Sequence, residues 1–230
     1  MFGFLKPLFV TAVVTLLAPL SAFAANIYIS SSIDRPDRDV YNGLWFADLD
    51  ENGCQIIIEG TIEGGDFSKI KQIFAQKPIY DPSGGEISNP PTHVCLTSAG
   101  GSLAEAINIA RLFKLEEVTT IVPPKARCES ACSIIFMAGI ARGLPSRYLY
   151  PTSSLGFHAP SLLLKGDSFS SDQVTKAYDL AIQTTAEVSK LGILTPHAMT
   201  LFTSTPSTEM SYVDTPRDIL LTEIELMQKH

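Results

Sequence analysis

Short apolar runs of strand type alternate along most of the chain with amphipathic segments of helix type. "CQIIIEGTI" (54–62) and "VTTIVPP" (118–124) are rich in β-branched residues and are followed closely by glycine or end in proline, as buried strands often are. "SLAEAINIARLFKL" (102–115) and "SDQVTKAYDLAIQTTAEVSKLG" (171–192) instead repeat apolar residues at helical spacing. Strands that alternate with helices predict a parallel sheet with right-handed βα crossovers, in a single α/β domain.

The remaining segments are shorter, and their composition and spacing predict the elements between these four. They are an irregular N-terminal arm over 25–52, a helix over 66–77, a strand in "THVCLTSAGG" (92–101), a nearly all-apolar helix over 129–141, two short strands around a turn over 147–160, loops over 81–91 and 161–172, and one or two short helices beyond residue 195. Ser102 and Glu105 fit a capping box, which sets the start of the helix over 102–115.

The N-terminus has the form of a secretory signal. Lys6 precedes an apolar run that is short for a bilayer span, and Ala22-Phe23-Ala24 offers the small residues of a cleavage site. We therefore expect residues 1–24 to be a signal peptide and residues 25–230 to form the domain, in the periplasm or outside the cell. A retained N-terminal membrane anchor is the alternative.

Charge limits the classes of partner. The formal net charge is −7 at pH 7, and the sequence contains no block of basic residues. This composition argues against nucleic acid and against an anionic lipid surface as partners.

Four cysteines, Cys54, Cys95, Cys128 and Cys132, predict two disulfides in an exported chain. Three pairings of four cysteines are open. A zinc site is the rival interpretation, but the spacings include no C-x-x-C pair and no nearby histidine pair. A bond between Cys128 and Cys132 would brace the turn at Ser130, provided that Cys128 lies outside the helix, because i and i+4 side chains of a regular helix are poorly placed for bridging.

Ser130 is a candidate nucleophile because other segments offer the groups that a serine needs. A catalytic serine requires a base for its proton and donors for an oxyanion. Ala131 opens the apolar helix with an unpaired N–H, Gly100 and Gly101 end a strand without side chains in the way, and His158 ends a later strand. Parallel strands would collect these groups at their carboxyl ends. Taken singly, each also fits a structural role, as a helix cap, a turn or a buried histidine.

Two segments resemble the Clp protease proteolytic subunit family. "LTSAGGSLAEAINIARLF" is similar to its strand–Gly-Gly–helix segment, with Ala99 in place of the proline in its usual Ser-Pro-Gly-Gly. "SRYLYPTSSLGFHAP" resembles its Arg-Tyr-x-Leu-Pro-x-Ser-x-x-x-x-His-x-Pro segment, which carries the general base. The signal peptide and the Cys-Glu-Ser-Ala-Cys sequence look most like exported Clp-protease-like proteins of bacteria, a group of predicted periplasmic proteins.

The resemblance implies a Clp protease/crotonase-like fold and a serine peptidase that uses no cofactor. It gives Ser130 as nucleophile, His158 as base, and the N–H groups of Ala131 and of Gly101 or Gly100 as oxyanion donors. The substrate would be a peptide or protein. No ATPase partner is expected for an exported chain, and the subunit number stays open, since homo-oligomers are common in that superfamily.

The third, acidic member of the site is less defined. "STEMSYVD" (207–214) aligns best with the family's segment around its aspartate, which implies Glu209, with Thr208 and Asp214 as alternatives.

Three other interpretations remain open at the sequence level. The first is an inactive Clp/crotonase-like module for binding or assembly, suggested by the missing clear acid. The second is a Ser–Lys dyad with Lys165 or Lys176, whose lysine would have to be desolvated to lose its proton. The third is acyl-CoA chemistry as in crotonases, which export from the cytoplasm argues against.

Overall fold

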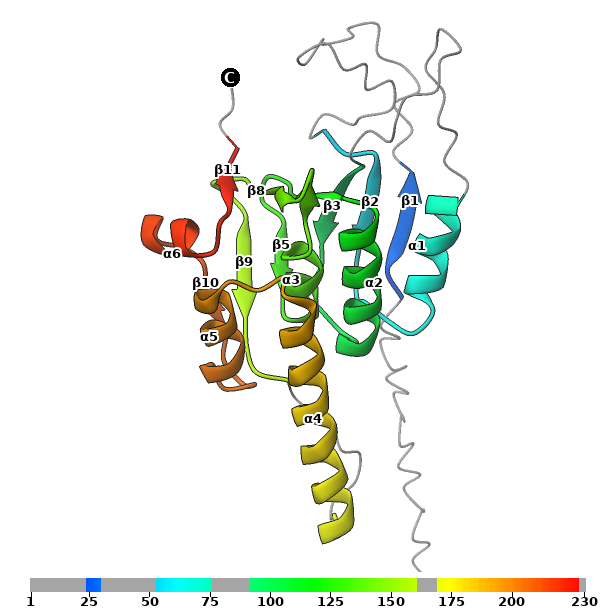
Figure 1. Cartoon of the computed structure of the whole chain (residues 1–230), viewed down its shortest axis with the longest axis vertical. Coiled ribbons are helices and arrows are strands. Elements are labelled where there is room, and N and C mark those ends of the chain that lie inside the picture. Colours follow the sequence, from blue (N-terminus) through cyan, green and yellow to red (C-terminus); the bar gives the residue numbers. More distant parts are fainter. Residues whose placement is uncertain (1–23, 30–52, 76–91, 161–168, 228–230) are drawn as a thin grey trace, which may run out of the picture.

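The computed structural model describes residues 24–29, 53–75, 92–160 and 169–227 (Figure 1). The predicted signal peptide up to residue 23, the arm from 30 to 52, the loop at 81–91 and most of the loop at 161–172 lie outside these residues.

A six-stranded, mostly parallel sheet organises the described chain. Its strand order is β1-β2-β3-β4-β8-β11, and every neighbouring pair is parallel except β1 with β2. The strands are β1 (Asn26–Ile29), β2 (Ile56–Glu59), β3 (His93–Thr97), β4 (Thr119–Val122), β8 (Arg147–Leu149) and β11 (Glu225–Leu226). This arrangement confirms the α/β class and the parallel sheet.

Strand β1 corrects the prediction of an irregular arm over 25–52. Asn26–Ile29 pairs antiparallel with β2, with Asn26 opposite Glu59 and Ile29 opposite Ile56. The segment has no long apolar run because it is an edge strand with exposed side chains at Asn26 and Tyr28. The pairing with β2, and not a local pattern, makes it a strand.

The helices follow the predicted order. They are α1 (Asp66–Ala75), α2 (Leu103–Leu115), α3 (Ala131–Phe136), α4 (Ser171–Leu191), α5 (Pro196–Ser204) and α6 (Pro216–Leu221). Gly192 caps the C-terminus of α4 in the left-handed conformation (φ 63°), which glycine adopts without steric cost. Figure 1 shows its N-terminal part extending past the other helices.

The capping box predicted for α2 is only half formed. Ser102 Oγ accepts from the amide of Glu105 at 3.3 Å. The Glu105 carboxylate does not turn back to Ser102 but accepts from the amide of Phe67 at 2.9 Å. It therefore ties the start of α1 to the start of α2.

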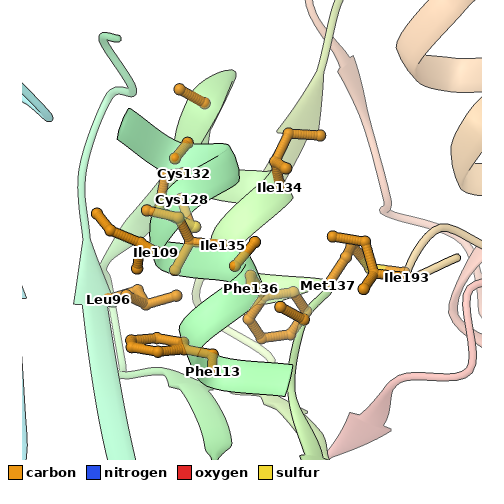
Figure 2. Close-up of a cluster of buried hydrophobic side chains, with 14 of the residues drawn as sticks. Leu96, Ile109, Phe113, Cys128, Cys132, Ile134, Ile135, Phe136, Met137 and Ile193 are labelled. Carbon is orange, nitrogen blue, oxygen red and sulfur yellow. A yellow bond between two sulfur atoms is a disulfide. The ribbon is translucent and has the colours of Figure 1, made fainter. Parts of the chain in front are cut away.

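Helix α3 lies at the centre of the hydrophobic core. All six of its residues are buried, including Phe136, and Phe113 of α2 is fully buried nearby. Figure 2 shows these side chains together with Leu96 and Ile109. Full burial of each large apolar side chain contributes about 1.5–3 kcal/mol relative to leaving it exposed. The core thus fixes the helix that begins immediately after Ser130.

A second, three-stranded sheet in the order β10-β9-β5 lies beside this helix. It contains β5 (Arg127–Glu129), β9 (Ser154–Phe157) and β10 (Ser211–Tyr212). The two strands predicted over 147–160 are present as β8 and β9, but they belong to different sheets. A short hairpin of β6 (Ile140–Ala141) and β7 (Leu144–Pro145) precedes β8.

The helix predicted over 129–141 is wrong at both ends. The chain is a strand as far as Glu129, and α3 covers only 131–136. Strand β5 has only three residues, so its sequence cannot be told apart from the start of the apolar helix that follows. Its pairing with β9 and the bridge between Ser98 and Cys128 define it.

Buried Arg147 ties the C-terminal segment to the sheet. Its guanidinium donates to the carbonyl oxygens of Gly139, Ile193 and Thr222, at 3.1 to 3.3 Å. Burial lowers the pKa of Arg147 to about 10, while the charge of Glu223 acts in the opposite direction. The side chain therefore stays charged at neutral pH, with backbone carbonyls in place of water.

The four cysteines form two disulfides, as predicted, and the structure selects the pairing. Cys54 bonds to Cys95 and Cys128 to Cys132, with Cα–Cα distances of 5.5 and 5.1 Å. Cys128 lies in β5, outside the helix, as the short bond requires. Two buried disulfides indicate an oxidising compartment outside the cytoplasm. No helix within the described ranges is long and apolar enough to cross a membrane.

The two disulfides should stabilise the fold by different amounts. The effect of a cross-link on the unfolded chain grows with the loop that it closes, and the paired cysteines are 41 and 4 residues apart. We expect the Cys54→Ala/Cys95→Ala variant to lose about 4 kcal/mol of unfolding free energy, and Cys128→Ala/Cys132→Ala about 2 kcal/mol.

Urea unfolding under non-reducing conditions measures both losses. All four cysteines are at most 1% exposed. Replacing either pair by alanine therefore leaves a similar buried cavity, and the cavities lower the unfolding free energy of the two variants by similar amounts. A larger loss for the Cys128–Cys132 pair would contradict the expectation.

Candidate active site

Ser130 has an unusual backbone conformation at the junction between β5 and α3. Its φ is 56° and its ψ is −123°. A serine rarely adopts a positive φ, and such a conformation costs on the order of 1–3 kcal/mol unless its surroundings hold it. The Ser130 side chain makes no capping hydrogen bond to the helix. The role of helix cap, which the sequence left open, is therefore excluded, and the hydroxyl is available for another role.

Hydrogen bonds on both sides hold the turn at Ser130. The amide of Ser130 donates to the carbonyl of Gly156 in β9, and the amide of Glu129 donates to Ser98 O, both at 3.0 Å. On the helix side, the amide and the hydroxyl of Ser133 donate to Ser130 O at 3.0 and 2.6 Å. The conformation of Ser130 thus follows from its strand neighbours and from the first turn of α3.

Gly100 packs directly against this turn. Its φ is 98°, and a Cβ placed on it would lie 2.6 Å from Ser130 Cβ and 3.0 Å from the amide nitrogen of Ala131. No side chain fits there, since real Cβ atoms do not approach other heavy atoms so closely. The Gly-Gly segment and the candidate nucleophile, 30 residues apart in the sequence, are therefore in van der Waals contact.

The hydrogen bonds of the two glycines separate their candidate roles. The amide of Gly100 donates to Ser98 Oγ at 3.0 Å, and its carbonyl accepts from Ile62. The amides of Gly101 and Ala131 have no acceptor among the described residues. Of the two glycines, Gly101 is thus the one whose N–H is available for an oxyanion, together with that of Ala131.

His158 follows the strand next to Ser130. Strands β5 and β9 are parallel neighbours with Glu129 opposite Gly156, so Ser130 and His158 both follow the carboxyl ends of these strands. His158 Nδ1 lies 2.7 Å from the carbonyl oxygen of Ala159. Because a carbonyl only accepts, the neutral imidazole in this contact carries its proton on Nδ1 and keeps the lone pair on Nε2. A general base needs this tautomer.

The structure places the candidate acids on the surface. Thr208, Glu209 and Asp214 are all exposed, and Glu209 lies in the turn that follows α5. Among the described residues, no hydrogen bond joins His158 to a carboxylate. The role of Glu209 stays a prediction, while the carbonyl of Ala159 is the observed partner of Nδ1.

A contact next to the site was not predicted from the sequence. Tyr212 in β10 donates its hydroxyl to Glu129 Oε1 at 3.1 Å. Gly156 lies between these residues in the sheet register, and its missing side chain leaves room for Met210 and for the ring of Tyr212. Burial and the bond to Glu129 raise the pKa of the Tyr212 hydroxyl. This contact joins the C-terminal segment to the residue before Ser130. The sequence did not predict it because a strand of two residues has no recognisable local pattern.

The structure does not support Lys176 as the base of a Ser–Lys dyad. Lys176 lies on α4 with its side chain 80% exposed, 4.0 Å from the carboxylate of Asp172. A lysine this exposed lacks the desolvation that a lysine base requires. Lys165 lies outside the described residues. Within the described segments, no three His, Cys, Asp or Glu side chains gather as metal ligands.

A scan against protein-family models and a search of the curated proteins both find no match to this chain. The geometry around Ser130 is therefore the main observation on which a function can rest.

Substitution of Gly100 tests the packing of the site. We expect Gly100→Ala to lower the reaction rate of Ser130 with a fluorophosphonate by on the order of a hundredfold, because the new methyl group must displace the nucleophile or the amide of Ala131. Rates of covalent labelling, followed by mass spectrometry, measure this loss.

Gly143→Ala is the matched control. Gly143 also has a positive φ (77°), but nothing lies within 4 Å of an added Cβ. Both variants should lose about 1 kcal/mol or more of stability from the strained backbone, and only Gly100→Ala should lose reactivity. Equal labelling rates in the two variants would show that Gly100 does not shape the site.

Proposed function

We propose that this chain is an exported serine hydrolase that cleaves peptides, with Ser130 as nucleophile and His158 as general base. The observation that carries the proposal is the conformation of Ser130. A strained serine whose hydroxyl makes no hydrogen bond to the described residues stands at the start of a helix, in contact with Gly100. Strained backbone of this kind persists where the surrounding structure imposes it, and it is found often at active sites.

The residues support acyl transfer in a defined order. His158 Nε2 takes the proton of Ser130 Oγ as the oxygen attacks the carbonyl carbon of the substrate. The amides of Gly101 and Ala131 donate to the oxyanion that forms. His158 then gives the proton to the leaving amine, and water hydrolyses the acyl-enzyme by the same route. Throughout, Nδ1–H stays bonded to Ala159 O, which holds the ring and stabilises its positive charge.

The Clp protease/crotonase-like fold and the periplasmic or secreted location belong to this proposal. The parallel sheet and the glycine–helix segment next to Ser130 support the fold, and the two disulfides support export. The subunit number and the identity of the peptide remain outside the proposal.

One observation favours a second candidate, an inactive module of the same fold that binds a peptide or assembles. His158 bonds to a backbone carbonyl, where a triad would supply a carboxylate. Turnover of model peptides and esters distinguishes the two, because an inactive module gives no more product than its Ser130→Ala variant.

Labelling with a fluorophosphonate tests the hydrolase directly. We expect one covalent adduct, located at Ser130, and none in the Ser130→Ala variant. Ser189→Ala is a matched control that should label at the wild-type rate, because Ser189 is exposed on α4 and is not one of the residues that hold the turn at Ser130. Labelling of the Ser130→Ala variant at the wild-type rate would refute the proposal.

Substitution of Glu209 tests the identity of the partner of His158. The Glu209→Gln variant should label within about threefold of the wild-type rate, since an exposed side chain that does not touch His158 has little effect on it. The His158→Ala variant, measured in parallel, should lose labelling. A loss of about a hundredfold or more in Glu209→Gln would instead assign Glu209 as the acid of a triad.

A further inference from the structure

The disulfide between Cys128 and Cys132 encloses Ser130 in a ring of five residues. Cys128 belongs to β5, Cys132 belongs to α3, and Ser130 is the middle residue of the segment between them. The two Cα atoms are 5.1 Å apart. A change in the φ or ψ of Ser130 re-orients β5 relative to α3, so it has to move one of the two bonded sulfur atoms.

The turn needs such a tether because its conformation is unfavourable for serine. Once the restraints are removed, a serine with a φ of 56° relaxes to a negative φ. On the strand side, the amides of Glu129 and Ser130 donate hydrogen bonds to Ser98 and Gly156. On the helix side, the hydrogen bonds to Ser130 come from the amide and hydroxyl of Ser133. The disulfide is a second covalent link between the two sides, in addition to the main chain through Ser130.

Relaxation of the turn would separate the groups that react. Ala131, which supplies the amide, is the residue next to Ser130. Gly100 packs against both residues so closely that no side chain fits between them. A displacement of about 1 Å in a catalytic group can reduce a rate by on the order of a hundredfold. The chemistry of Ser130 therefore depends on restraints that act on its own backbone.

We propose that Cys128 and Cys132 are positioning residues for Ser130 that act only when bonded, so that the hydrolase is latent in its reduced form. The inference rests on the proposed function. The two thiols transfer two electrons to a donor disulfide and release two protons, and the donor leaves as two thiols. A chain that has not yet met such a donor carries an inactive site, and it gains activity in an oxidising compartment.

The second disulfide offers an internal control. Val94 and Leu96 of β3 point into the main core below α2 and α3, whereas Cys95 points to the opposite face of the sheet. There Cys54 and Cys95 form a separate cluster with Ile121, and none of these residues belongs to the site. Both disulfides are equally buried, so a reductant has no easier access to one of them.

The experiment compares two double variants in the full chain. Cys54→Ala/Cys95→Ala should label with a fluorophosphonate within about threefold of the oxidised wild-type rate, since distant sites act independently. Cys128→Ala/Cys132→Ala should label slower by on the order of tenfold or more. The order is the reverse of the order expected for the loss of stability, so general destabilisation does not produce it.

A titration with a phosphine reductant supplies a second measurement. In Cys54→Ala/Cys95→Ala, only the Cys128–Cys132 bond remains, so the labelling rate should fall as free thiols appear and recover on reoxidation. In Cys128→Ala/Cys132→Ala, the low rate should not respond to the reductant. Circular dichroism at each point shows that the protein stays folded.

The outcomes separate this inference from the function on which it rests. If the oxidised wild-type protein is not labelled at Ser130, the proposed hydrolase is refuted and the inference with it. If the oxidised wild type is labelled and Cys128→Ala/Cys132→Ala is labelled equally fast, only the inference is overturned.

Discussion

The hydrogen bond from the amide of Ser130 to the carbonyl of Gly156 is the contact on which the site depends. It joins the turn that carries the candidate nucleophile to the strand that carries the candidate base, since His158 follows Gly156 by two residues. A side chain at either end can rotate, but the two backbones cannot separate without breaking the short parallel sheet. The structure thus fixes the main-chain positions of Ser130 and His158 relative to each other.

Segments far apart in sequence support this contact from two sides. Ser98 bonds to the main chain on both sides of Cys128, and Gly100 closes the space beside Ser130. From the C-terminal side, Tyr212 reaches across Gly156 to Glu129. At both glycines another part of the chain occupies the volume that a side chain would need: the Ser130 turn at Gly100, and the side chains of Met210 and Tyr212 at Gly156.

Much of the fold was predictable from the sequence because many elements carry local signals. Helix α4 has a helical period and a glycine at its end, and β2, β3 and β4 are β-branched apolar runs that lead into glycine or proline. The failures share a cause. Strands β1 and β5 have four and three residues, and each is defined by the strand beside it. Unlike β2 and β4, which are no longer than β1, neither lies in a continuous β-branched apolar run that marks it as a strand.

The candidate site divides in the same way. Ser130, Ala131, Gly100, Gly101 and His158 were predicted because turn chemistry and a family resemblance mark them. The structure brings Gly100 and the serine into contact. The tautomer of His158, set by its neighbour Ala159, and the contact between Tyr212 and Glu129 could not be predicted. Both depend on how the chain continues after β9, which composition does not reveal.

A crystal structure of the oxidised protein after reaction with a fluorophosphonate tests the central claim most directly. If the backbone of Ser130 presents its hydroxyl to an oxyanion site, phosphorus will be bonded to Ser130 Oγ. One phosphonyl oxygen will then lie about 3 Å from the amide nitrogens of Gly101 and Ala131. An adduct whose oxygen points to solvent, or a Ser130 with a negative φ, would contradict the account.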